Sequence, residues 1–184
     1  MGNYLGSTAL KTQAVINEAM GGVLFIDEAY SLCAKDDVYG SEAIATLLKA
    51  MEDHRDDLVV IIAGYEEPIR KLINSNPGLA SRFARFIRFP DYTAEELFQV
   101  LEQMCRKSDY CLDPAAEAPL RALLEDKVRR KGEHFANARE VRNLFDAART
   151  RQTLRIAGLK DADDQTYRTL TAEDFGLVPG KEQA

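Results

Sequence analysis

Two apolar runs constrain the fold of this 184-residue chain more than any other feature. Residues 23–26 and 58–63 contain no polar side chain, and the second run is rich in β-branched residues. A strand with one face in water alternates apolar and polar residues, whereas a strand inside a parallel sheet is apolar on both faces. The apolar spacing over residues 41–53 predicts a helix joining the two runs. The sequence therefore predicts an α/β fold with a parallel sheet buried on both faces.

The chain around these strands supplies further elements. A helix is expected over residues 7–20, with an apolar face formed by Leu10, Ala14 and Val15. Another helix is expected over residues 66–73. The segment 86–89, apolar except for Arg88, is typical of a third short strand, which Pro90 would end.

After residue 90 the pattern becomes helical. Thr93 and Glu96 have the spacing of a capping box, which predicts a helix to about residue 107. Two further helices are expected over residues 113–132 and 137–157. We therefore expect an α/β core over residues 1–90, a helical domain over 91–175 and a disordered tail over 176–184.

Composition narrows the classes of function. The formal net charge of -6 provides no general attraction to nucleic acid. No apolar run approaches the roughly 20 residues that a membrane-spanning helix needs. The three cysteines form no metal-spaced pair, which favours reduced thiols and a cytoplasmic location. His54 and His134 have no neighbours at metal-ligand spacing, so neither receives a role.

The acidic pair Asp27-Glu28 directly follows the first apolar run. This position is the carboxyl edge of a parallel sheet, where ligands of α/β proteins bind. Asp27 there could hold Mg²⁺, and Glu28 could activate the water that attacks a γ-phosphate. The same two residues also suit a simple turn between a strand and a helix, and the pair alone does not separate these readings.

Five motifs in fixed order separate them. They are Asn3-Tyr4-Leu5-Gly6, the segment 22–30 around Asp27-Glu28, Ala63-Gly64-Tyr65, the segment 76–83 (NPGLASRF) and the segment 137–142 (NAREVR). Together they resemble AAA+ ATPases of the CbxX/CfqX group, which includes red-type RuBisCO activase, stage V sporulation protein K and type VII secretion ATPases. The resemblance covers roughly residues 3–175. It implies a partial P-loop NTPase sheet with helices, followed by a small all-α lid.

The resemblance implies a role for each matching residue of the core. Asp27 and Glu28 match the Walker B pair, which binds Mg²⁺ and ATP and drives hydrolysis. Arg82 matches the arginine finger, which reaches the nucleotide of a neighbouring subunit, and Arg85 is a second candidate for that role. A surface arginine in a turn would be the plainer interpretation of Arg82 without the family match.

The lid and the amino terminus also carry matching residues. Arg139 matches the sensor 2 arginine that contacts phosphate, and Arg142, one helical turn further on, is the alternative or an ion-pair partner. Tyr4, with Leu5, matches the pore loop that grips a threaded polypeptide, although a tyrosine packed on a helix start is equally compatible with the sequence. Residues 64–66 do not supply the usual sensor 1 asparagine, so that residue is not assigned.

A phosphate-binding loop is not found. Residues 6–12 approach its pattern, but Leu10 replaces the second glycine, the spacing is one residue short and no strand precedes the segment. Members of the group carry the loop upstream of the position that matches residue 1. We therefore expect that the strand that would lie between segments 58–63 and 86–89 in the sheet is missing. These two segments would then flank a gap. We also expect no ATP binding by this chain alone.

These residues predict an ATP-hydrolysing module that remodels or threads a protein substrate within a hexameric ring, with ATP and Mg²⁺ as cofactors. One alternative is a non-catalytic assembly subunit that lends Arg82 to its neighbour. Another is an AAA+ protein that acts on DNA, which would require a basic path along the pore. Neither nucleic acid nor a membrane is expected as a partner.

Overall fold

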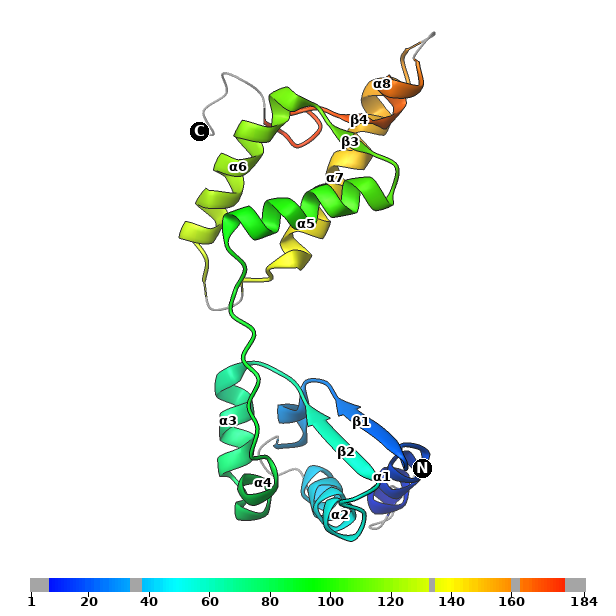
Figure 1. The fold of residues 1–184 in the computed structure, drawn as a ribbon, viewed down its shortest axis with the longest axis vertical. Helices are drawn as coiled ribbons and strands as arrows, with labels where there is room; N and C mark the ends of the chain where they lie inside the picture. The colour runs from blue at the N-terminus through cyan, green and yellow to red at the C-terminus, as the bar shows by residue number, and fades with distance from the viewer. Residues whose placement is uncertain (1–6, 34–37, 133–134, 160–162, 178–184) are drawn as a thin grey trace. The chain divides into compact units, whose positions relative to one another are not determined.

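The computed structural model describes residues 7–33, 38–132, 135–159 and 163–177. The chain divides into two compact units, residues 1–88 and 89–184, and each is considered by itself (Figure 1). Tyr4 and Leu5 lie outside the described residues, as do His134 and residues 178–184 of the expected tail. The chain is α/β in its first unit and mostly helical in its second.

The first unit contains the predicted parallel strand pair. β1 (Gly22–Ile26) pairs with β2 (Leu58–Ile62) in a register that sets Gly22 beside Leu58 and Ile26 beside Ile62 (Figure 1). Parallel strands need a crossover connection, and α2 (Val38–Asp53) supplies it. The spacing of apolar residues in the sequence correctly predicted this β-α-β unit.

Helices cover one face of the strand pair. α1 (Ser7–Glu18) and α2 pack on Leu24, Leu58 and Val60, and Ile16 and Leu47 are buried among them. A second cluster joins α2 to α3 (Glu66–Asn74) and α4 (Pro77–Arg82) through Ile44, Leu72 and Leu79. The short helix α4 was not predicted from the sequence; the side chain of Asn76 caps it by accepting from the Gly78 amide, and Pro77 follows at its first position.

The opposite face of the strand pair is exposed among the described residues. Val23, Phe25, Val59 and Ile61 point to this face, and Phe25 is 58% exposed. The prediction of a sheet buried on both faces is therefore wrong for this structure. Apolar strands showed that both faces suit a core, but burial also requires a covering element, and no described helix packs there.

Two other expectations fail for the same reason. Residues 83–93 form neither helix nor strand, so segment 86–89 is not a strand, and Ile87 is 82% exposed. In the described residues this segment does not pair with β2. In α1 the buried residue is Ile16, while Leu10 and Val15 are exposed, so the predicted apolar face of this helix faces away from the core.

The second unit is built on three helices. α5 (Ala94–Lys107) packs against α6 (Pro114–Arg129) and α7 (Ala138–Ile156). The predicted capping box of α5 is present: the Thr93 hydroxyl accepts from the Glu96 amide at 3.2 Å, and the Glu96 carboxylate accepts from the Thr93 amide at 2.8 Å. The Thr93 amide and the Thr93 hydroxyl both donate to the Glu96 carboxylate, and these two bonds lower the pKa of Glu96.

The end of the chain returns to these helices. β3 (Cys111–Leu112) pairs with β4 (Thr169–Leu170), and the short helix α8 (Asp164–Arg168), which the sequence did not predict, precedes β4. The core contains Leu97, Leu101, Leu120 and Phe145, and Leu177 packs against it. Residues 176–177, expected at the start of a disordered tail, are therefore part of this unit.

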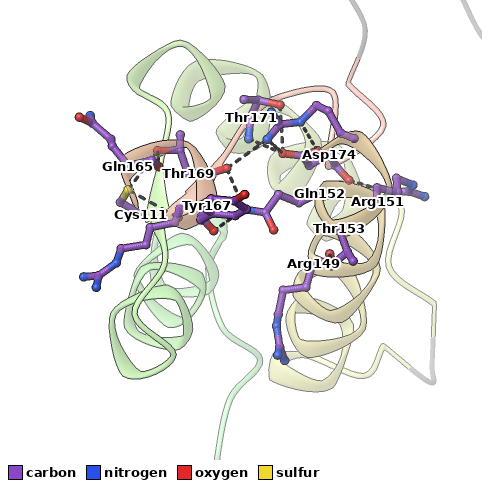
Figure 2. A network of polar contacts seen from close by, with 12 residues as sticks. Cys111, Arg149, Arg151, Gln152, Thr153, Gln165, Tyr167, Thr169, Thr171 and Asp174 are labelled. Carbon is purple, nitrogen blue, oxygen red and sulfur yellow. Dashed lines mark hydrogen bonds and ion pairs between the residues drawn. The ribbon is translucent and has the colours of Figure 1, made fainter. Parts of the chain in front are cut away.

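Two buried polar side chains attach this returning segment to α7. Gln152 donates to the carbonyls of Tyr167 and Thr169, and the Asp174 carboxylate accepts from the Thr171 amide at 2.8 Å (Figure 2). Arg155 of α7 also donates to both oxygens of Asp174. Burial alone would raise the pKa of Asp174, but the bonds from Arg155 and Thr171 outweigh it and lower that pKa.

Candidate functional site

The acidic pair lies at the carboxyl end of β1. The Ile26 carbonyl accepts from the Ala63 amide, and the Ala29 amide donates to the Ala63 carbonyl, so the chain stays beside β2 on both sides of the pair. Both carboxylates are exposed. The sequence-based expectation that β1 presents Asp27 and Glu28 at this edge of the strand pair agrees with the structure.

The backbone at the pair is unusual. Glu28 has φ +49°, in the left-handed region that a residue with a Cβ seldom adopts. Its amide donates to Asp27 Oδ1 at 2.9 Å. The turn directs the chain into the 3₁₀ helix η1 (Ala29–Cys33). Strained conformations of this kind are common at functional sites, which is consistent with a chemical role for the pair.

Tyr30 packs beside the pair because Gly64 leaves space for its ring. A Cβ on Gly64 would lie 2.8 Å from the Tyr30 ring, and the φ of Gly64 is +156°. Burial and the charges of Glu28 and Asp27 raise the pKa of Tyr30, so its hydroxyl stays protonated at neutral pH. Tyr65 follows Gly64 and lies near Tyr30, with ring centroids 6.4 Å apart. No role was assigned to Tyr30 from the sequence. Gly64, directly after β2, is the residue that could have indicated a ring packed at this position.

The donor set suits Mg²⁺ bound together with phosphate. One oxygen of Asp27 accepts from the Glu28 amide, which leaves the other oxygen for a cation or its water. Within the described part of the chain no group of three or more His, Cys, Asp or Glu residues could enclose a metal. Mg²⁺ is commonly held by one or two carboxylates plus water and substrate phosphates, and Asp27 with Glu28 offers that set.

Arg82 ends α4 and is held by an ion pair. Its Nη2 lies 2.7 Å from Glu52 Oε2, and its Nη1 lies 3.4 Å from the Gly78 carbonyl. Its Nε is buried and donates no hydrogen bond to any described group. Glu52 could not be recognised from sequence as the partner of Arg82, because 30 residues separate the two.

The ion pair places Arg82 far from the acidic pair of its own chain. Glu52 is in the last turn of α2, the helix that returns the chain to the amino end of β2. Asp27 follows the carboxyl end of β1. A five-residue strand is roughly 16 Å long, so the two groups lie toward opposite ends of the strand pair. The ion pair therefore holds Arg82 away from Asp27 of its own chain.

Arg85 lies in the connecting segment 83–93 and is exposed. No hydrogen bond or ion pair is found for its side chain among the described residues. Nothing in the structure fixes it, in contrast to Arg82.

Arg139 and Arg142 belong to the second unit, on the first turns of α7. Both are exposed. The described residues supply no ion pair to either guanidinium, so they do not support the alternative in which Arg142 is an ion-pair partner. The two cations are available to an anionic ligand. The residue before α7, Asn137, has φ +47°; it begins the motif 137–142 but was given no role from the sequence.

The fold therefore divides the predicted site residues between the two units. Asp27, Glu28, Arg82 and Arg85 belong to the first unit, and Arg139 and Arg142 belong to the second. Among the described site residues of the first unit, only Asp27 and Glu28 lie together.

Comparison with known families agrees with this architecture. Residues 1–91 match the ATPase family associated with various cellular activities (AAA), and residues 93–184 match the AAA lid domain. The chain belongs to the AAA ATPases, a family that uses nucleotides, typically with Mg²⁺.

Individual relatives support the resemblance to the CbxX/CfqX group. The chain is 48% identical over 179 residues to protein CbbX of Cereibacter sphaeroides, an alignment covering 95% of this chain and 57% of CbbX. It is 49% identical over 158 residues to the chloroplastic ribulose bisphosphate carboxylase/oxygenase activase of Cyanidioschyzon merolae, covering 85% and 53%. It is also 46% identical over 181 residues to the chromosomal CbxX of Cupriavidus necator, covering 95% and 56%. The chain spans little more than half the length of these relatives.

Two further observations concern the environment of the protein. None of the helices in the described ranges is long and apolar enough to cross a membrane. All three cysteines, Cys33, Cys105 and Cys111, are free thiols.

Proposed function

We propose that this chain is the Walker B and lid part of an ATP-hydrolysing motor that works as a hexameric ring in a reducing, cytoplasm-like compartment. The observation that carries the proposal is the separation of Arg82 from Asp27-Glu28 within one chain. A guanidinium held at the far end of the strand pair serves catalysis only if it completes the site of another subunit. A ring of subunits provides that arrangement.

Each residue then has a distinct task. Asp27 holds Mg²⁺ through its free oxygen, and Glu28 accepts the proton of the attacking water. Arg82 donates to the phosphoryl oxygens of the nucleotide bound by the neighbouring subunit. Residues of this kind raise the rate of hydrolysis by about 10³–10⁵-fold. Arg85 is the second candidate for this contribution. Arg139, with Arg142 as the alternative, donates to phosphate from the lid. Mg²⁺ held at Asp27 would supply charge that neutralises the phosphates during the reaction.

The substrate proposed for the ring is a protein segment. One relative is named as an activase of ribulose bisphosphate carboxylase/oxygenase, which is itself an enzyme. Tyr4 and Leu5 are proposed to grip the segment, on the strength of the motif alone. The net charge of -6 disfavours the DNA-acting alternative.

The test uses assemblies in which this chain is mixed with a related subunit that carries a phosphate-binding loop. We expect Arg82→Ala to lower ATP turnover at the sites that this chain completes by at least about 10³-fold, with nucleotide affinity unchanged. Arg88→Ala is the matched control, because Arg88 is an exposed arginine of the same unit that pairs with Glu66. A large loss of affinity in Arg82→Ala would instead show that Arg82 acts within its own subunit.

A second variant separates the motor from the non-catalytic assembly subunit. Glu28→Gln keeps the shape of the side chain but removes the base, so where the assembly supplies a phosphate-binding loop to the site of this chain we expect turnover to fall by about 10²–10⁴-fold. Unchanged turnover in Glu28→Gln, together with loss in Arg82→Ala, would establish the non-catalytic subunit. Sequencing the coding DNA upstream of Met1 for an in-frame Gly-rich lysine loop would show whether the chain supplies its own phosphate site.

A further inference from the structure

Asn137, directly before α7, has a strained backbone. Its φ of +47° and ψ of −123° lie in a region that favours glycine. Such a conformation is strained for a residue with a Cβ, which keeps it only where its surroundings impose it. The side chain of Asn137 must therefore supply interactions that offset this cost.

Three hydrogen bonds meet that requirement. Asn137 Oδ1 accepts from the Tyr92 amide at 2.9 Å, and Nδ2 donates to Asp91 Oδ1 at 2.8 Å and to the Phe135 carbonyl at 3.3 Å. The Tyr92 amide requires an acceptor and the Asp91 carboxylate requires a donor, so the orientation of the Asn137 amide is unambiguous. Glycine would relieve the backbone but could make none of these bonds.

The network extends to the end of α6. Lys131 Nζ lies 2.7 Å from Asp91 Oδ2, the oxygen that Asn137 does not use. Lys131 and Asp91 are each 40% exposed, so this ion pair alone contributes little. Together the bonds join the connecting segment, the end of α6 and the start of α7 at one point.

We propose that Asn137 is a positioning residue that makes residues 91–92 and the first turn of α7 one rigid piece. Arg139, two residues further on, is exposed and unpaired among the described residues and is free to meet phosphate. A displacement of Arg139 therefore moves the segment that leads back toward the first unit, and a displacement of that segment moves Arg139. The meaning of this link for catalysis rests on the proposed role of Arg139; the link itself does not.

The mechanical link is tested on the whole chain without nucleotide, by amide hydrogen exchange at Tyr92. Asn137→Gly removes the acceptor of the Tyr92 amide, so we expect its exchange to become at least about tenfold faster. The Leu120 amide, in the core of α6, is the internal reference and should exchange unchanged. Equal Tyr92 exchange in both proteins would overturn the proposal.

A second test exchanges the amide of Asn137 and the carboxylate of Asp91 and introduces no glycine. Asn137→Asp places a carboxylate against Asp91, so we expect faster Tyr92 exchange. Combining Asn137→Asp with Asp91→Asn restores one amide facing one carboxylate and keeps an acceptor for the Tyr92 amide. We expect exchange to return to within about threefold of the original protein. No recovery in the double variant would show that this pairing does not fix the segment.

The effect of Asn137 on ATP turnover is tested in the assemblies in which this chain is mixed with a related subunit. If Asn137 acts through Arg139, Asn137→Gly lowers ATP turnover, and adding Asn137→Gly to Arg139→Ala causes no further loss. Fully multiplicative losses would overturn the role of Asn137 as a positioning residue for Arg139. An absence of ATP turnover in the unaltered assemblies would instead overturn the proposed function, while Tyr92 exchange would still decide the mechanical link.

Discussion

Arg82 and Glu52 form an ion pair, Nη2 to Oε2, of 2.7 Å that joins the end of α4 to the last turn of α2. The pair keeps the guanidinium at the end of the strand pair opposite the acidic residues Asp27 and Glu28. Because the Arg82 Nε is buried without a hydrogen-bond partner in the described residues, Glu52 is the principal group that orients the side chain.

Loss of the Glu52 charge should affect catalysis more than stability. Glu52 is 60% exposed, so Glu52→Gln should lower the free energy of unfolding by less than about 1 kcal/mol in urea denaturation. We expect about tenfold slower ATP turnover in mixed assemblies, because the guanidinium is no longer held. Glu18→Gln, at the end of α1, is the control. Equal turnover in the two variants would contradict an orienting role for Glu52.

Neighbouring residues of β2 should respond very differently to truncation. Leu58 is buried under α1 and α2, so Leu58→Ala should lower the free energy of unfolding by about 2–5 kcal/mol. Val59 is on the exposed face, so Val59→Ser should change it by less than about 1 kcal/mol. Denaturant unfolding of the purified chain measures both. An equal loss in Val59→Ser would show that this face is covered in solution.

The second unit should lose stability in acid through Asp174. Because the folded-state pKa of Asp174 is lowered, its contribution is complete above the unfolded pKa of about 4 and is lost as pH falls through the lower folded value. Asp174→Asn should cost about 1.5–3 kcal/mol at pH 7 and weaken the acid dependence. Thermal unfolding between pH 7 and pH 2 checks this. An unchanged pH profile in Asp174→Asn would be inconsistent with the network in Figure 2.

The three cysteines should differ in reactivity. Burial, with smaller contributions from Cys111 and Glu102, raises the pKa of Cys105 to about 11, so almost none of its thiol is ionised at pH 8. Cys33 and Cys111 are exposed. Brief iodoacetamide treatment followed by mass spectrometry should modify Cys33 and Cys111 but leave Cys105 intact until the protein is denatured. Rapid labelling of native Cys105 would contradict its burial against α6 and α7.

Local patterns in the sequence correctly predicted several features. An apolar run followed by Asp27-Glu28 was enough to predict a strand that presents two carboxylates at its carboxyl end. The spacing of Thr93 and Glu96 predicted the start of α5, because a capping box involves only neighbouring residues. The motif order also identified the family, because it depends on residue identity rather than on contacts.

Only the tertiary structure decided which apolar and polar groups find partners. Phe25 and residues 86–89 have the composition of buried strands, yet they are exposed, because burial depends on a covering element that local sequence does not specify. The bonds of Arg82 with Glu52 and of Asn137 with Asp91 join residues far apart in the chain. The sequence by itself determined the chemistry offered at the end of β1. Folding determined where Arg82 is held and how Arg139 is attached, because those positions depend on contacts between distant segments.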